Sequence, residues 1–151
     1  MTKPVLFCYD GSEGSRTALS AAAQWITPTD AVVLTVWTPA EVLLTRAGSF
    51  IVSIPNEGEV DDEESATAQR IATEGAEGAQ SRGYNAVART AEATESVART
   101  IQEVAEEIDA GLIICGQRGR GALGSVLLGS VSHALAAHTK RPVLIAPQQV
   151  P

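Results

Sequence analysis

Hydrophobic residues occur along the chain in two alternating patterns, short continuous runs and stripes with helical spacing. The first run is PVLFCY at residues 4–9, and the polar sequence DGS follows it. A short apolar run that ends in this way is typical of a buried strand followed by a helix start. Over residues 13–26 the apolar positions recur at helical spacing, which predicts a first helix.

The same alternation continues through the rest of the chain. Residues 31–37, AVVLTVW, are rich in β-branched side chains and predict a second buried strand. The acidic cluster at 57–64 favours a helix start, because carboxylates stabilise the N-terminus of a helix. The remaining predicted elements are a helix with a thin apolar face over 61–82, an outer strand over 84–89, a helix over 95–109, a strand over 111–115, a helix from about 127 to 138 and a strand over 142–146.

Residues 38–60 interrupt this pattern. The segment contains two prolines and two glycines and has no sustained period. We interpret it as an irregular connection, long enough to be a lid or a partly ordered loop. Among the aromatic residues, Trp25 is interpreted as core, whereas Trp37 at the end of the second strand is either core or the border of a bound base.

Strands that alternate with helices favour parallel pairing with right-handed crossovers. The predicted fold class is therefore α/β, an open five-stranded parallel sheet with helices on both faces in the Rossmann-like or flavodoxin-like order 3-2-1-4-5. With 151 residues and 44% hydrophobic content, we expect one domain over residues 1–151. In this order a crevice opens between the carboxyl ends of the first and fourth strands, where Asp10 and the loop after residue 115 would meet.

Charge is distributed unevenly along the chain. The net charge is −7, which argues against a nucleic-acid binder that grips phosphates over a broad surface. All 18 acidic residues lie in residues 1–109, whereas residues 110–151 carry four basic residues and no acidic one. The last quarter of the chain is therefore suited to an anion.

The cysteines and histidines give little support to metal or redox chemistry. Cys8 and Cys115 lie inside apolar runs and are interpreted as buried thiols, because no CxxC motif is present. His133 and His138 are five residues apart and so do not share a metal-binding face of a helix. The N-terminal run reaches Asp10 before a signal-peptide core is complete, so we expect a cytoplasmic protein without a membrane segment.

The segment with the clearest chemistry is 116–131, GQRGRGALGSVLLGSV. Glycines let a backbone approach a ligand closely, and the amides at a helix start bind phosphate. Gly129, Ser130 and Val131 are the candidate amide donors, and Arg118 and Arg120 are suited to phosphate. The alternative is a flexible turn whose glycines only satisfy backbone geometry and whose arginines are solvated.

The pattern Gly116-x2-Gly119-x9-Gly129-Ser130 resembles the nucleotide-binding signature of the ATP-binding branch of the universal stress proteins. The resemblance extends to VLFCYDGSEGSRTAL near the start and RPVLIAP near the end. Gln117 stands where these proteins more often have a small hydroxyl residue. The resemblance implies that the glycines, Ser130 and Val131 surround ribose and phosphates, that Asp10 contacts the adenine end and that the backbone of Val36 lies beside the base.

Asp10 has two interpretations that the sequence leaves open. Its carboxylate would be repelled by a triphosphate, so a binding role means accepting hydrogen bonds from an adenine amine or a ribose hydroxyl. The alternative is an aspartate that caps the first helix.

The resemblance implies a regulator that binds ATP or another adenine nucleotide, with or without Mg²⁺, and acts through conformation or partners. It also implies a homodimer that pairs the edge strand 142–146, which is short and apolar. No GxxxxGK[ST] loop is present, so fast turnover is not expected. Two alternatives remain: a slow hydrolase or nucleotidyl-transfer enzyme in which Asp10 holds a metal, and a flavodoxin-like electron carrier.

Overall fold

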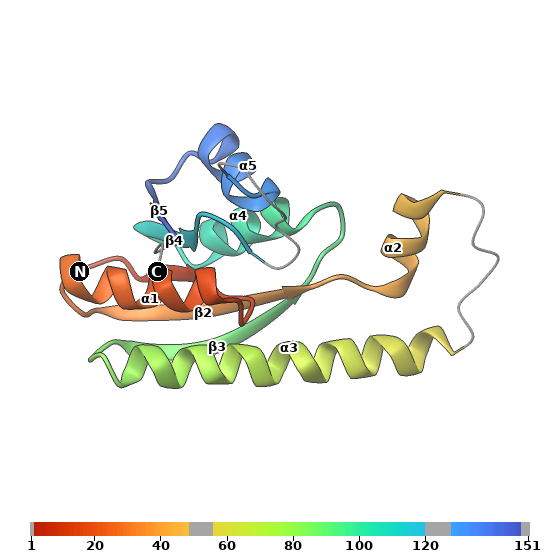
Figure 1. Ribbon diagram of the computed structural model, residues 1–151, viewed down its shortest axis with the longest axis horizontal. Coiled ribbons are helices and arrows are strands. Elements are labelled where there is room, and N and C mark those ends of the chain that lie inside the picture. The colour runs from red at the N-terminus through yellow and green to blue at the C-terminus, as the bar shows by residue number, and fades with distance from the viewer. Residues whose placement is uncertain (1, 49–55, 120–127, 149–151) are drawn as a thin grey trace.

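The computed structural model describes residues 2–48, 56–119 and 128–148. Figure 1 shows a sheet with helices above and below it and one helix set apart at its end. In chain order the elements are β1 (Val5–Cys8), α1 (Glu13–Trp25), β2 (Asp30–Trp37), α2 (Ala40–Ala47), α3 (Glu57–Gln80), β3 (Asn85–Glu92), α4 (Val97–Glu107), β4 (Leu112–Gly116), α5 (Ser130–His138) and β5 (Val143–Ala146).

The five strands form one parallel sheet in the order β3-β2-β1-β4-β5, which confirms the predicted fold class. β1 lies in the middle of the sheet, pairing with β2 through Phe7↔Val33 and with β4 through Phe7↔Ile114. The strand order reverses direction between β1 and β4, so a crevice is expected at their carboxyl ends.

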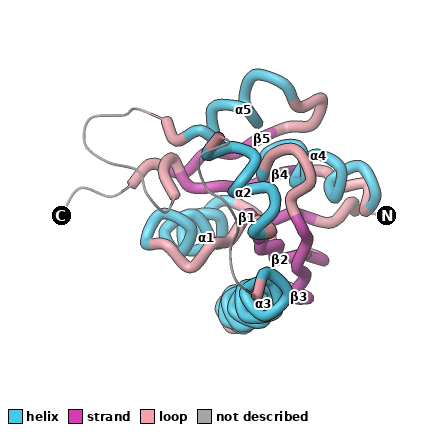
Figure 2. The backbone as a smooth tube through the Cα atoms, turned by 90° about the vertical axis from the view of Figure 1, so that its right-hand side faces the viewer, coloured by secondary structure: helices cyan, strands magenta, loops and turns pink. Residues whose placement is uncertain are grey.

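Two hydrophobic layers hold the sheet between the helices. Side chains of α1 and α3, such as Leu19 and Ala76, pack with Phe7 on one face. Side chains of α4 and α5, such as Ile101 and Leu135, pack on the other. Figure 2 shows this division end-on, with α1 and α3 on one side of the strands and α4 and α5 on the other.

The prediction of an irregular connection over 38–60 is wrong for most of the residues that the structure describes there. Residues 40–47 form α2, and α3 begins at Glu57, as the acidic cluster had indicated. Pro39 stands at the N-cap of α2. The helix has only eight residues, too few for a hydrophobic period to become visible in the sequence.

Trp25 is not part of the core, contrary to the prediction, since its side chain is 83% exposed. The buried stripe of α1 runs through Ala18 and Ala22. Ile26, one residue beyond the helix, is partly buried and packs against the core. Among the described residues, no helix is both long enough and apolar enough to cross a membrane.

Candidate functional site

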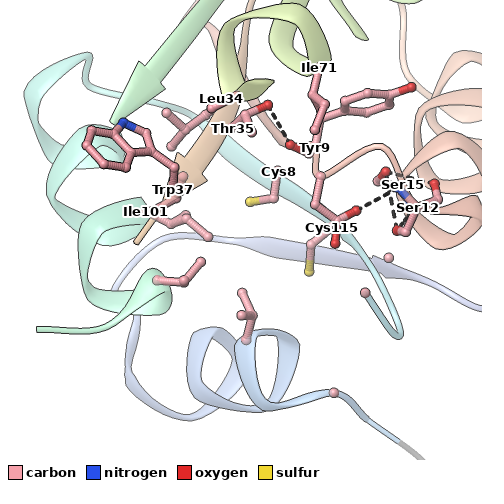
Figure 3. A pocket seen from close by; sticks show the side chains of 18 of the residues that line it. Cys8, Tyr9, Ser12, Ser15, Leu34, Thr35, Trp37, Ile71, Ile101 and Cys115 are labelled. Atoms are coloured by element: carbon pink, nitrogen blue, oxygen red, sulfur yellow. Dashed lines mark hydrogen bonds between the residues drawn. The ribbon is translucent and has the colours of Figure 1, made fainter. Parts of the chain in front are cut away.

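A cavity of about 650 Å³ opens at the carboxyl ends of β1, β2 and β4. A volume of this size suits a small organic ligand. In Figure 3 Trp37 lies toward one end of the cavity, and Ser12 and Ser15 lie toward the other. The first end is mainly apolar, with Val97 and Ile101 of α4 in its wall, whereas the second is formed by α1 and the glycine-rich turn.

The glycine-rich turn and the start of α5 form the polar wall of the cavity. Gly129 is the N-cap of α5, and no side chain caps this helix. The first residues of the helix, Ser130 and Val131, line the cavity. The carbonyl oxygen of Gln117 accepts hydrogen bonds from the Gly129 amide at 2.8 Å and the Ser132 hydroxyl at 2.9 Å. These bonds fix the helix start against the end of β4, where amides and the helix dipole favour an anion.

This wall is possible only because glycines bring backbones together. A Cβ on Gly116 would lie 2.6 Å from the carbonyl oxygen of Gly14, and a Cβ on Gly14 would lie 2.2 Å from the carbonyl oxygen of Arg118. Both separations are far inside van der Waals contact. The turn after β4 therefore crosses directly over the first turn of α1, and Gly14 supports this wall without lining the cavity.

Asp10 lies between β1 and α1 but does not cap the helix. The N-cap is Ser12, whose hydroxyl accepts the Ser15 amide at 3.2 Å. One carboxylate oxygen of Asp10 accepts the Ser12 amide at 2.9 Å. The other lies 2.7 Å from the position of a Cβ on Gly119, so the carboxylate and the turn after β4 meet, as predicted.

The backbone of Val36 faces the crevice, by the alternation of the sheet. In β2 the carbonyl of Leu34 accepts the amide of Tyr9, whereas the carbonyl of Trp37 bonds to the β3 side through Ala93. The peptide groups of Val36 therefore point to the β1 side, like those of Leu34. Because β1 ends at Cys8, they face the cavity rather than another strand.

The wall opposite α5 comes from α2, which lies wholly past the end of the sheet, and from α3, whose first turns extend past it (Figure 1). Glu64, Thr67 and Ile71 of α3 and Leu43 of α2 line the cavity. The Ala40 amide donates to the Asp61 carboxylate at 2.8 Å, which ties α2 to α3. The Arg46 guanidinium also donates to the carbonyl of Glu95, so the far end of α2 is tied to the segment before α4.

Tyr9 holds α3 against the end of β1. Its hydroxyl donates to Glu74 at 2.7 Å, and Arg16 pairs with the same carboxylate at 2.9 Å. Burial, followed by the bond to Glu74, raises the pKa of Tyr9 to about 12. The bonds from Tyr9 and Arg16 lower the pKa of Glu74. The Thr35 hydroxyl donates to the Tyr9 carbonyl at 2.7 Å, which fixes β2 beside the same residue.

The two cysteines lie in the floor of the cavity as free thiols, in agreement with the prediction. Cys115 is buried, and Cys8 is partly exposed. Burial raises the pKa of Cys115 to about 11. Burial also raises the pKa of Cys8 well above its usual value, and the negative charges of Cys115 and Asp10 add to the effect.

The structure gathers most of the predicted site residues around one cavity. Gln117 is not among the described residues that line it, and its side-chain oxygen accepts the Gln148 amide at 3.3 Å instead. Arg120 lies outside the described residues. The predicted residues that line the cavity are Asp10, Val36, Gly116, Arg118, Gly119, Gly129, Ser130 and Val131.

Sequence reasoning missed the contribution of the helices. Thr67 and Ile71 are four residues apart on one face of α3, a spacing visible in the sequence. No sequence signal showed that this face extends beyond the sheet. Leu43 was missed because α2 itself was not predicted.

Comparisons with known proteins agree with this architecture. The hypothetical protein MJ0577 shares the fold, with a TM-score of 0.78, 20% identity and coverage of 100% of this chain and 99% of that one. A universal stress protein in complex with cAMP has a TM-score of 0.64 and 23% identity, covering 97% of this chain and 98% of its own. The Archaeoglobus fulgidus universal stress protein in complex with dAMP has a TM-score of 0.63 and 18% identity, and the match covers 96% of this chain and 97% of that one.

Two curated relatives and a family match identify the chain. A Mycolicibacterium smegmatis universal stress protein is 45% identical over 51 residues, which are 34% of this chain and 17% of that protein. The universal stress protein YxiE of Bacillus subtilis is 30% identical over 148 residues, 96% of this chain and 99% of the relative. Residues 1–147 also match the universal stress protein family. The chain therefore belongs to the universal stress protein family.

Proposed function

We propose that this protein binds an adenine nucleotide, ATP in the first instance, and acts as a stress-response regulator through nucleotide-dependent conformation or partners. The observation that carries the proposal is the cavity itself, which joins the start of α5 and Arg118 to the backbone of Val36. Phosphates would lie at the amides of Ser130 and Val131, and the base would lie beside Val36 and Trp37. Two solved relatives in complex with cAMP and dAMP support an adenine nucleotide as the ligand.

Each end of the cavity suits the corresponding part of a nucleotide. The base end is apolar and offers the peptide groups of Val36. Asp10 lies nearer the other end, beside Ser12 and Gly119, and is proposed to accept a hydrogen bond from an adenine amine or a ribose hydroxyl. No acidic residue occurs after Asp109, so the segment that faces the phosphates carries no opposing charge of its own. Mg²⁺ would arrive with the phosphates, since this ion usually keeps several waters and takes only one or two carboxylates.

The assembly and compartment also belong to this proposal. β5 is an edge strand of the sheet, and we propose that two copies of the chain pair there as a homodimer. Two free thiols are consistent with action in a reducing cytoplasm.

Fluorescence of Trp37 tests the binding proposal. In a Trp25→Phe variant, Trp37 is the remaining tryptophan, and the exposed position of Trp25 makes the substitution nearly neutral for stability. We expect ATP to change the emission of Trp37 saturably, with one nucleotide per chain, and GTP to do so only at higher concentration. Mass spectrometry of small molecules released from the freshly purified protein gives an independent answer. A flavin in that extract, or no emission change with any adenine nucleotide, would contradict the proposal.

A further inference from the structure

The two thiols in the cavity floor lie side by side on neighbouring strands. β1 and β4 pair as Leu6↔Ile113 and Phe7↔Ile114, so continuing this register by one residue places Cys8 opposite Cys115. Both side chains lie on the face that α4 and α5 cover. Figure 3 shows their sulfurs entering the cavity region from neighbouring strands.

The strand spacing does not suit a disulfide between them. Neighbouring parallel strands lie about 4.8 Å apart, and in-register side chains leave the sheet in the same direction. A disulfide needs Cβ atoms only about 3.5–4.5 Å apart, so the two strands would have to move together. A metal held linearly between two sulfurs, with metal–sulfur bonds of about 2.3 Å as in zinc thiolates, spans about 4.6 Å. The strand spacing is therefore closer to the span of a bridging ion than to that of a disulfide.

We propose that Cys8 and Cys115 form a two-thiolate site for a soft monovalent cation, with copper(I) as the biologically available example. Thiolates favour soft ions, copper(I) and zinc among them. Zinc is not favoured, because a structural zinc site needs four ligands. Within residues 2–48, 56–119 and 128–148, no cluster of three or more His, Cys, Asp or Glu side chains is placed to hold a metal.

The groups that line the cavity act on the charge of such a complex in both directions. Binding exchanges two thiol protons for one copper(I), which gives a bis-thiolate complex with one net negative charge and no change of oxidation state. Arg118 and the start of α5 line the same cavity and favour an anion there, whereas the carboxylate of Asp10, which raises the pKa of Cys8, opposes one. Because both thiols are largely protonated near neutral pH, the apparent copper affinity should rise as the pH is raised.

The test uses the full chain, reduced and without oxygen, and one equivalent of copper(I) supplied as its acetonitrile complex. Native mass spectrometry in the presence of a competing copper(I) chelator should show one copper per chain. Cys8→Ser and Cys115→Ser should each lose the metal under the same competition. His133→Ala should keep it, because His133 is exposed on α5 and lies outside the cavity.

Circular dichroism establishes that each variant is folded, and X-ray absorption of the copper-loaded wild type gives a readout that needs no variant. Two sulfur neighbours and no nitrogen or oxygen neighbour are expected. Absence of copper from the reduced, folded wild type would overturn the assignment. Copper retained by either serine variant, or an intramolecular disulfide formed readily with diamide, would do the same. None of these results depends on nucleotide binding, so this inference and the proposed function stand or fall separately.

Discussion

The backbone of Gly116 at the end of β4 lies directly against the carbonyl oxygen of Gly14 in the first turn of α1. A Cβ on Gly116 would lie 2.6 Å from that oxygen. Neither residue has room for a side chain, because a Cβ on Gly14 would meet the carbonyl of Arg118 in turn. The two glycines therefore hold the first helix, the fourth strand and the following turn in one arrangement. The cavity depends on that arrangement.

We expect Gly116→Ala to destabilise the protein by about 1–3 kcal/mol, the usual cost of overpacking. The neighbouring atoms are backbone, which cannot rotate away. Urea unfolding followed by circular dichroism measures the effect. Gly78→Ala is the matched control, because its nearest neighbours would be 3.7 Å away and alanine favours the helix, so that variant should gain up to about 1 kcal/mol. Equal stability of the two variants would show that the close approach is not real.

Gly129→Val tests the amide cradle without disturbing the fold. The backbone of Gly129 has an ordinary extended conformation, and its Cβ would find its nearest neighbours at 3.5 Å. The branched side chain should instead obstruct the approach of phosphate to the start of α5. We expect ATP affinity to fall about a hundredfold, or about 2.8 kcal/mol. The ATP affinity of Gly129→Ala should fall less. Unchanged affinity in a folded Gly129→Val protein would remove the start of α5 from the site.

Asp10 separates the recognition of the base from the binding of phosphate. We expect Asp10→Ala to reduce the preference for adenine over guanine nucleotides by about 10- to 100-fold. The reason is that a hydrogen bond to a charged group contributes about 1.5–3 kcal/mol. Asp10→Asn keeps an oxygen for the Ser12 amide and thus controls for loss of the turn. Isothermal titration with ATP and GTP measures the preference. If both variants discriminate like the wild type, Asp10 does not read the base.

The alkaline stability of the protein should depend on Tyr9. Its pKa is about 12 in the folded protein against about 10 when the chain is unfolded. The unfolded chain therefore loses this proton first, and the stabilisation, fully present below pH 10, is lost as the pH rises toward 12. Urea unfolding between pH 8 and pH 11 should show that the wild type loses more stability than Tyr9→Phe, which has no phenol at this position. Parallel pH profiles would contradict the raised pKa of Tyr9.

The sequence predicted the sheet and its order because buried parallel strands are continuous apolar runs, and β1, β2 and β4 all have this form. It predicted the polar wall because glycines and a helix start follow β4. It did not predict α2, because eight residues are too few to show a hydrophobic period. It also did not predict the exposure of Trp25, because the buried face of α1 ends with Ala22, before the last residues of the helix. Gly14 was missed for another reason. Its neighbour is more than 100 residues away in the chain, and only the folded structure brings them together.

The edge strand β5 allows a direct test of the proposed homodimer. The carbonyls of Pro142 and Ala146 accept bonds from Ile113 of β4 and from Gln117 just after it. The alternation of a parallel ladder therefore turns the amide of Ile145 outward to the open edge. Ile145→Pro should therefore remove an amide that faces a second copy while keeping the bonds to β4. Sedimentation equilibrium should give twice 15.7 kDa for the wild type and 15.7 kDa for the variant. A conservative Ile145→Val protein should remain dimeric. A wild type that sediments as a monomer at micromolar concentration would exclude the dimer, and a dimeric proline variant would place its interface elsewhere.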